Sequence, residues 1–439
     1  MAKVSSFTFG TYQVDTARSI VSFTYHVTFK NGKRRTYTDR LFLKDVTPEN
    51  WESVPKSVLE PTLQALLLML GINYWTVFPT RNMYIDGFSL TREQADFWNT
   101  LYLHGLGEYF FDMKMDFKDL IAFPYNETLE APIPTRLELP TRALVLNGAG
   151  KDSILSAELL KASHVPFDFF AFSPTPAHER IAKLVGERTI RANRLRDGRV
   201  SLHASFHLVS AAYPSVSTFT FVAVLLSELL GYDSLVFSNE RSADFGNLTY
   251  RGLKVNHQWC KSSTAEKLIN DYVHSFITPD IKTMSLLREY SELEIVRRFI
   301  GYPKYLPYVT SCNSYFWQPR LQQLLQRKAY WCNECPKCVF LFACFSAFLP
   351  KKVVLEMFGS NLYRKRRHLK LIRRILGTEG FKPLDCVGEP EEMILAMHYA
   401  SRTGEYKNDR AMRMFENLFP SSYNFKTLEE EILCRASTT

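Results

Sequence analysis

The first 45 residues alternate apolar and polar positions, as β-strands with one buried face do. Residues 20–29 read Ile-Val-Ser-Phe-Thr-Tyr-His-Val-Thr-Phe, and a second alternating run lies at 35–38. Asn31-Gly32 lies between them, and this dipeptide favours the left-handed backbone of a type I′ turn. The pattern therefore predicts a β-hairpin at the start of the chain.

Helical spacing replaces the alternation over residues 55–115, and Thr91 with Gln94 has the spacing of a capping box. The segment 124–140 contains Pro132, Pro134 and Pro140, which is typical of a linker. We therefore expect an N-terminal α+β domain over residues 1–135.

Strands and helices alternate from residue 142 to about residue 301. Apolar strands are predicted at 143–146, 167–172 and 234–237, with helices at 152–161, from about 177, and at 217–230. This rhythm predicts an α/β fold with a doubly wound parallel sheet over 140–310. Ligands bind such sheets at the carboxyl ends of the strands, so the turn after 146, Ser173 and the loop after 237 should converge on one site. Residues 311–439 are predicted to form a helical, cysteine-containing region.

A turn of small residues follows the strand at 143–146. It reads Gly148-Ala149-Gly150-Lys151-Asp152-Ser153. Small residues let backbone N–H groups close around a phosphate, at the positive end of the next helix. The spacing is not that of the common nucleotide loop, which has four residues between glycine and Gly-Lys-Ser/Thr. The other interpretation is a plain strand-to-helix turn capped by Asp152 or Ser153.

Polar residues also follow the strand at 234–237. Asn239, Glu240 and Arg241 come first, and Asn247 lies further along the loop. A carboxylate such as Glu240 is suited to hold Mg²⁺ against phosphates, and Arg241 to pair with a phosphate or a carboxylate. The alternative is a polar surface loop.

Residues 255–262, Val-Asn-His-Gln-Trp-Cys-Lys-Ser, carry several proton-transfer groups. His257, Cys260 and Lys261 supply an imidazole, a thiol and an ammonium within five positions. The spacing does not say which of them takes a proton.

The chain has eight cysteines, and none precedes Cys260, which argues against a secreted disulfide framework. Cys332, Cys335 and Cys338 have two residues between neighbours, and Cys312 lies 20 residues before Cys332. Four thiolates in this pattern suit a structural, tetrahedral Zn²⁺. Buried free cysteines or a redox pair are the alternatives.

Composition limits the classes of partner. A chain of 439 residues with 46% hydrophobic and 23% charged residues is globular and long enough for two or three domains. Its net charge of +9 suits anionic ligands such as nucleotides. The basic tract at 364–370 lacks interleaved aromatic residues, so we read it as a solvated helix face and expect no nucleic-acid partner. The sequence has no signal-peptide core and no membrane-length apolar stretch, so we expect a cytoplasmic location without a membrane partner. It carries no signal for an oligomeric state.

Together these motifs resemble the UDP-N-acetylmuramoyl-L-alanyl-L-glutamate epimerases, the MurL family, across roughly residues 140–390. The matching segments are the glycine turn with Lys151-Asp152-Ser153, Asn239–Ala243 with Gly246-Asn247, Val255–Gln258 with Lys261-Ser262, Ser291–Leu293, Cys332–Cys338 and Asp385–Glu389. The turn itself resembles the Ser-Gly-Gly-x-Asp-Ser pyrophosphate loop of enzymes that split ATP into AMP and pyrophosphate. Gly148 and Ala149 replace its first Ser and Gly, and Glu289-Tyr290 replaces an expected Pro-Leu.

The resemblance implies a fold of the adenine-nucleotide α-hydrolase type, with ATP and Mg²⁺ as cofactors. ATP would bind the glycine turn together with Ser173, Asn239 and Asn247. The expected substrate is a UDP-muramoyl dipeptide, whose terminal L-glutamate is inverted to D-glutamate with release of AMP and pyrophosphate. The expected catalytic residues are His257, Lys261, Glu240 and Arg241.

Adenylation would make this inversion feasible because it removes the carboxylate charge next to the α-carbon, so that a base of ordinary strength can act. Two other functions remain open at this stage. One is a pyrophosphate-loop enzyme that modifies RNA or a deazapurine precursor, and the other is a zinc-stabilised nucleotide-binding scaffold without turnover.

Overall fold

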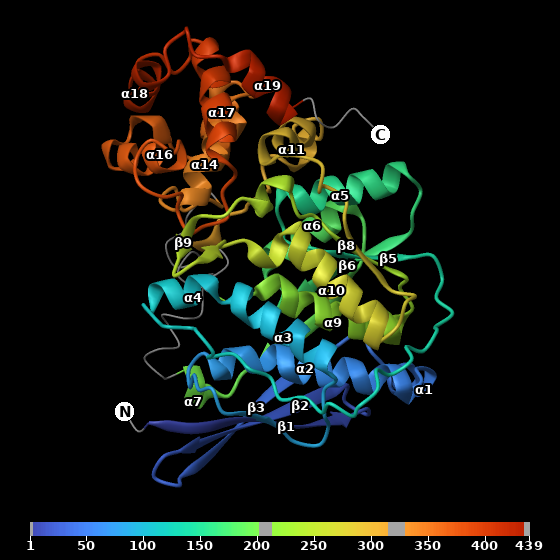
Figure 1. The fold of residues 1–439 in the computed structure, drawn as a ribbon. Helices are drawn as coiled ribbons and strands as arrows, with labels where there is room; N and C mark the ends of the chain where they lie inside the picture. The colour runs from blue at the N-terminus through green and yellow to red at the C-terminus, as the bar shows by residue number, and fades with distance from the viewer. Residues whose placement is uncertain (1–2, 202–212, 315–329, 434–439) are drawn as a thin grey trace.

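The computed structural model describes residues 3–201, 213–314 and 330–433 (Figure 1). The strands are β1 Val4–Asp15, β2 Ile20–Phe29, β3 Arg34–Leu43, β4 Met83–Ile85, β5 Ala143–Leu146, β6 Phe167–Phe172, β7 Thr189–Leu195, β8 Ser234–Phe237, β9 Leu248–Tyr250, β10 Leu253–Val255 and β11 Lys282–Ser285. The helices up to residue 314 are α1 Pro48–Ser53, α2 Lys56–Trp75, α3 Arg92–Gly105, α4 Gly107–Asp112, α5 Lys151–Ala162, α6 Pro176–Val185, α7 Gly198–Ser201, α9 Ser215–Leu230, α10 Ser263–Phe276 and α11 Glu292–Phe299. Those after residue 330 are α14 Pro336–Ser346, α15 Lys351–Phe358, α16 Leu369–Ile375, α17 Pro390–Arg402, α18 Arg410–Leu418 and α19 Phe425–Leu433. Short 3₁₀ helices lie at η1 Arg241–Asp244, η2 Trp259–Lys261, η3 Pro303–Tyr305, η4 Leu362–Arg364 and η5 Arg366–His368.

One nine-stranded sheet runs through the molecule in the order β11-β8-β5-β6-β7-β3-β2-β1-β4. The five strands from β11 to β7 are parallel, as the alternation of strands and helices predicts. The N-terminal hairpin joins them through an antiparallel pairing of β3 with β7. The sheet therefore continues across the boundary near residues 135–140 that the prolines predict.

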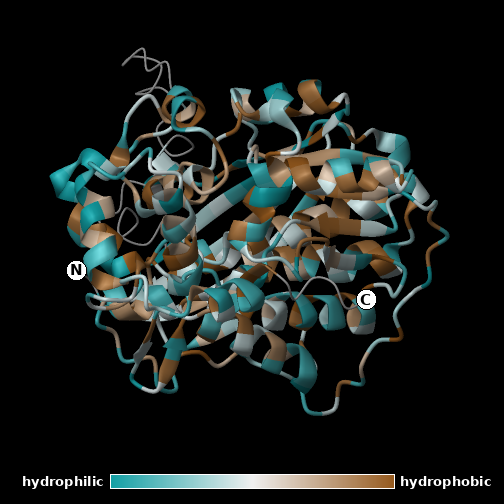
Figure 2. Cartoon of the chain, turned by 90° about the horizontal axis from the view of Figure 1, so that it is seen from above, coloured by the Kyte–Doolittle hydropathy of each residue, from teal (hydrophilic) through white to brown (hydrophobic). Residues whose placement is uncertain are grey.

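Helices cover both faces of the parallel strands, because alternate strand residues pack into different cores. Leu144 of β5 packs into a core with α2, α9 and α10. Its neighbours Ala143 and Val145 pack into a second core with α5 and α6. Figure 2 shows apolar strands and helices through the interior of the molecule and more polar residues at its periphery. The parallel strands are thus covered on both faces, as in a doubly wound sheet.

The local signals in the N-terminal region are confirmed. Gly32 has φ +81° in the turn between β2 and β3, a left-handed conformation that glycine adopts without strain. The Thr91 side chain accepts a hydrogen bond from the Gln94 amide at the start of α3, and the Gln94 side chain binds back to Thr91. Residues 124–140 form no helix or strand.

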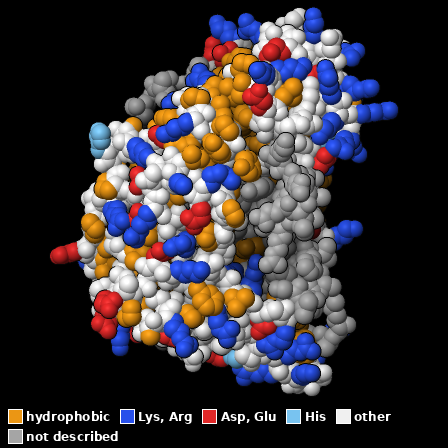
Figure 3. Space-filling view, turned by 180° about the vertical axis from the view of Figure 1, so that it is seen from behind, with side chains coloured by type: hydrophobic (Ala, Val, Ile, Leu, Met, Phe, Trp, Pro, Cys, Tyr) orange, Lys and Arg blue, Asp and Glu red, His pale blue; other side chains and the backbone are white. Residues whose placement is uncertain are grey.

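The region after residue 330 is helical, as expected, and packs around α14, which contacts α15, α16 and α17. Figure 3 shows Lys and Arg side chains over the back of the molecule and gathered at its upper end, where this region lies. Among the described residues, no helix combines the length and the apolar character that crossing a membrane requires.

Candidate functional site

The order of the parallel strands identifies where a ligand would enter. The chain moves outward from β5 through β6 to β7, then returns to the other side of β5 for β8 and β11. In open α/β sheets, a crevice forms at the carboxyl ends of the two strands where the direction reverses. A pocket of about 290 Å³ lies at this position, between Gly148 and Gly150 after β5 and Ser238, Asn239 and Glu240 after β8.

The glycine turn is built to bring its backbone close to that pocket. Ala149 has φ +53°, a left-handed conformation that costs roughly 1–2 kcal/mol for a residue other than glycine. Its amide donates to Asn147 Oδ1 at 2.8 Å, which fixes the turn. A Cβ on Gly150 would lie 2.8 Å from Ser311 Oγ and 3.4 Å from the Thr310 carbonyl oxygen, so the turn packs closely against the segment that covers it. Asp152 and Ser153, in the first turn of α5, line the pocket.

Lys151 is fully buried, and it is not among the residues that line the pocket. Its ammonium binds the carboxylates of Asp152 and Glu292. Lys337 Nζ binds the other oxygen of Glu292 at 2.6 Å and itself reaches the pocket. Burial alone would raise the pKa of Glu292, but the ammonium groups of Lys151 and Lys337 hold it well below its usual range. This network of Lys151, Glu292 and Lys337 thus places the Lys337 ammonium at the pocket wall.

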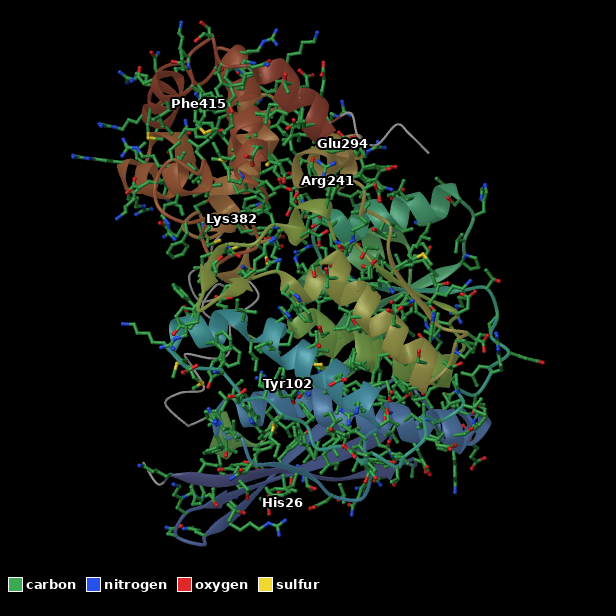
Figure 4. The ribbon with its side chains drawn as sticks, viewed as in Figure 1. His26, Tyr102, Arg241, Glu294, Lys382 and Phe415 are labelled. Atoms are coloured by element: carbon green, nitrogen blue, oxygen red, sulfur yellow. The ribbon has the colours of Figure 1, made fainter. Side chains whose placement is uncertain are left out.

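The predicted site residues in the loop after β8 point in two different directions. Asn239 and Glu240 line the pocket. Glu240 is 3% exposed, and its Oε1 atom has no hydrogen-bond partner among the described residues. Arg241 turns away: its guanidinium lies 3.3 Å from the carbonyl oxygen of Glu431 in α19, and it is not part of the pocket lining. Figure 4 shows Arg241 at the end of the domain that faces the C-terminal helices.

Lys261 belongs to a cluster of titratable groups at the opposite wall, and His257, another member of the cluster, lies outside the pocket lining. Lys261 and Cys386 both line the pocket. A ring nitrogen of His257, Sγ of Cys386 and a carboxylate oxygen of Asp385 lie within 4.8 Å of one another. His257 Nδ1 binds the carboxylate of Glu108 from α4.

The charges in this cluster stabilise one another. Burial alone would raise the pKa of the Cys386 thiol, but the Lys261 ammonium and the His257 ring lower it below its ordinary value. Burial alone would lower the pKa of His257, but Cys386 and Glu108 raise it well above its ordinary value. Cys386 is therefore biased toward a thiolate and His257 toward an imidazolium.

Arg288 fixes the distance between the two walls of the site. Its guanidinium donates to the carbonyl oxygen of Glu240 at 3.1 Å and to that of Lys261 at 2.8 Å. It also pairs with Glu266 of α10 at 2.8 Å.

Ser173 and Asn247 are predicted nucleotide-binding residues that lie outside the pocket lining, as Ala149 and Lys151 do. Ser173 follows β6, and its Oγ accepts from the amide of Arg194 at 3.4 Å. The crevice opens between β5 and β8, whereas β6 lies on the other side of β5. Asn247 instead joins segments: its side chain donates to the Pro383 carbonyl at 2.7 Å and accepts from the His257 amide at 2.8 Å.

The four predicted metal ligands come together. The sulfur atoms of Cys312, Cys332, Cys335 and Cys338 lie within 4.8 Å of one another, and three of these residues are buried. The amides of Cys335 and Glu334 both donate to Cys332 Sγ at 3.4 Å. Amide donors stabilise a thiolate, so the cluster could hold a metal ion.

Several groups of the site lie outside the predicted set of site residues, among them Glu108, Glu292, Lys337 and Cys386. Lys337 did carry a signal, because it is the one charged residue in the otherwise apolar segment of α14. Glu292 and Cys386 lie in segments that support the family resemblance, but no spacing rule links them to the glycine turn. Glu108 lies 149 residues from its partner His257.

Comparison with known proteins identifies the family. Residues 1–286 match the model of the MurL N-terminal domain, and residues 308–429 match that of the MurL C-terminal domain. The chain is 32% identical over 372 residues to the UDP-N-acetyl-alpha-D-muramoyl-L-alanyl-L-glutamate epimerase of Xanthomonas oryzae pv. oryzae, covering 82% of this chain and 78% of that protein. It is 29% identical over 432 residues to the protein of the same name from a Micromonospora species, covering 96% and 92% of the two chains.

A solved structure described as a predicted subunit of a tRNA methyltransferase from Methanocaldococcus jannaschii is 19% identical and covers 36% of this chain and 75% of that one. Its TM-score of 0.25 is too low for any conclusion about this chain. The two domain models together span most of the sequence and include both walls of the pocket and the four cysteines. The chain belongs to the MurL family.

Proposed function

We propose that the protein is an epimerase that inverts the terminal L-glutamate of UDP-N-acetylmuramoyl-L-alanyl-L-glutamate to D-glutamate, a step in making peptidoglycan precursors. ATP activates the glutamate carboxyl as an adenylate, and AMP and pyrophosphate are released. The names of the two relatives support the substrate and the inversion. The ATP chemistry is our inference from the glycine turn.

One observation carries the proposal: the glycine turn, which is suited to phosphate binding, and two groups that can transfer a proton, Lys261 and Cys386, line the same pocket. Gly148, Gly150 and Ser153 form one wall, and Lys261 belongs to the other. Adenylation and proton removal must act on the same glutamate, so both sets of groups have to reach one substrate.

The chain's own residues would divide the work as follows. The backbone of the glycine turn and the start of α5 bind phosphate oxygens. Asp152 and Glu240 are the carboxylates suited to hold Mg²⁺, and the unpartnered Glu240 oxygen fits a missing ligand. Magnesium would supply charge neutralisation of the phosphates. Lys261 supplies a positive charge that stabilises the enolate. Together with His257, it lies in residues 255–262, the segment that carries the predicted proton-transfer groups.

We also propose that the four-cysteine cluster holds one structural Zn²⁺, because four convergent sulfur donors are the set that zinc prefers. The ion would tie Cys312 to the start of α14. Lys337 lies in the first turn of that helix, so the metal-bound cluster would hold Lys337 in place at the pocket wall.

The function is tested by incubating the protein with ATP, Mg²⁺ and UDP-N-acetylmuramoyl-L-alanyl-L-glutamate in D₂O. D-Glutamate should appear after hydrolysis and chiral separation, with deuterium at its α-carbon, and AMP should form with pyrophosphate. A variant with Gly150→Pro should abolish pyrophosphate release, since the turn could no longer close. Pyrophosphate release without inversion would contradict the epimerase and favour another ATP-splitting activity.

A further inference from the structure

Cys386 is placed where a reacting group of the substrate could meet it. It precedes α17, in a loop that reaches the pocket from the C-terminal region, and it is half-buried. It shares the pocket lining with Lys261 and Glu240. No role follows for this thiol from the glycine turn or from the four-cysteine cluster.

The thiol belongs to a relay of three side chains from three parts of the chain. Glu108 of α4 binds Nδ1 of His257, which leaves the opposite side of the ring for another partner. A ring nitrogen of His257 lies within 4.8 Å of Cys386 Sγ. A carboxylate that orients a histidine, which in turn activates a thiol, is the arrangement that makes a thiolate reactive at neutral pH.

The other groups around the thiol also favour its anion. Lys261 and Lys337 face it from the pocket wall and lower its pKa, against the effect of burial. Asp385 is an acidic group close to the thiol, and its Oδ1 already accepts from Asn313 at 2.6 Å and from the Cys386 amide at 2.7 Å. Its charge is thus partly satisfied by these donors.

A second observation points to a ligand in the same pocket. Glu240 is 3% exposed and lines the same pocket, yet its Oε1 atom has no partner among the described residues. A buried carboxylate oxygen left without a partner is costly unless an ion or ligand completes it. The pocket therefore holds a ligand site with the thiol in its wall.

We propose that Cys386 is a catalytic acid–base residue of this pocket, whose thiolate removes the α-proton of the activated glutamate on one face or returns it there. The inference rests on the proposed function, which supplies the adenylate. In removal, the Cα–H bond breaks, an S–H bond forms, and the electron pair of the C–H bond moves into the acyl group as an enolate. A second group donates a proton to the opposite face, and Lys261 is the ammonium that shares the pocket.

The test separates the two half-reactions in a variant with Cys386→Ala. Adenylation is followed as pyrophosphate–ATP exchange in the presence of the dipeptide substrate, and inversion as D-glutamate formed. Inversion should fall at least about 100-fold in both directions, the usual range for loss of an acid–base group. Pyrophosphate–ATP exchange should stay within about threefold of the original protein, because adenylation precedes proton transfer. This retained exchange also shows that the variant is folded.

The matched control is Cys344→Ala, because Cys344 is a buried cysteine of α14 outside the pocket lining. It should leave both rates unchanged. A second measurement uses the unaltered protein: iodoacetamide should modify Cys386, abolish inversion and spare pyrophosphate–ATP exchange, and the substrate should protect against it.

Three results would overturn the role of Cys386 while leaving the proposed function in place. The first is inversion by the Cys386→Ala variant within threefold of the original rate. The second is a parallel loss of adenylation and inversion in that variant. The third is a covalent glutamyl–cysteine adduct, seen in the mass of acid-quenched protein. If the unaltered protein neither exchanges pyrophosphate nor inverts glutamate, the proposed function itself is wrong.

Discussion

Glu292 is the residue on which the charge balance beneath the glycine turn depends. It is 1% exposed and binds Lys151 and Lys337 with different carboxylate oxygens. Glu292→Gln should lower pyrophosphate–ATP exchange at least about tenfold and cost about 3–5 kcal/mol of unfolding free energy, because it leaves two buried ammonium groups without their shared anion. Urea unfolding and the exchange assay measure the two effects.

The control lies two residues further along α11. Glu294 pairs with Arg297 and Arg298, whose side chains are 47% and 38% exposed. Glu294→Gln should cost about 1 kcal/mol or less, since water can solvate the released guanidinium groups, and it should leave exchange unchanged. Equal effects of the two variants would remove the special role of Glu292.

Glu108 is predicted to set the pH range of inversion. With Glu108→Gln, His257 loses the anion that raises its pKa, so the imidazolium becomes less stable and the pKa of Cys386 rises. Because the thiolate exists above the thiol pKa, the rising limb of inversion should move to higher pH. The pH profile of kcat/KM measures this shift, and the profile of pyrophosphate–ATP exchange should not move. An unshifted inversion limb would separate Glu108 from the thiol.

At the scale of elements, the four-cysteine cluster is predicted to support α14. Cys335→Ser removes one of four sulfur donors immediately before Pro336, where the helix begins. Metal analysis should find close to one zinc in the unaltered protein and a large loss in this variant. The Tm should fall as well, because metal binding contributes to folding. Cys344→Ser, on the same helix but outside the cluster, should keep its metal. Zinc-free protein with freely alkylated thiols would exclude the site.

Elements whose pattern is local were predictable, and contacts between distant segments were not. The strand expected at 143–146 and the β5 strand have the same bounds, because an apolar run between turn residues is complete within a few positions. The walls of the pocket were also predictable, because strand ends in a parallel sheet share one edge. Ser173 illustrates the limit: which strand end borders the crevice depends on strand order, and that order is not a local property. Glu108 is another case, since it meets His257 only through the packing of α4.

For the whole molecule, the decisive contact joins the hairpin to the parallel strands. Asp39 of β3 accepts from Nε of Arg194 in β7 at 3.0 Å and from its Nη2 at 2.6 Å. The same guanidinium donates to the Asn73 side chain and the Leu70 carbonyl of α2. Both charged side chains are almost completely buried, at 4% and 0% exposure. This pair therefore holds three elements together at the junction of the two halves of the sheet.

Arg194→Met should cost about 3–5 kcal/mol of unfolding free energy, because it leaves the Asp39 carboxylate buried without its cation. The double change Asp39→Asn with Arg194→Met should recover much of this loss, since no unpaired charge remains. Arg191→Met, on the same strand, removes an ion pair to Asp45 that is 44% and 20% exposed, and it should cost about 1 kcal/mol or less. Urea unfolding followed by tryptophan fluorescence measures the unfolding free energy of all three variants. In each unfolding curve, the hairpin should unfold in the same transition as the parallel strands. A separate early transition for the hairpin, or equal losses for the two arginine variants, would mean that the junction does not couple the two halves.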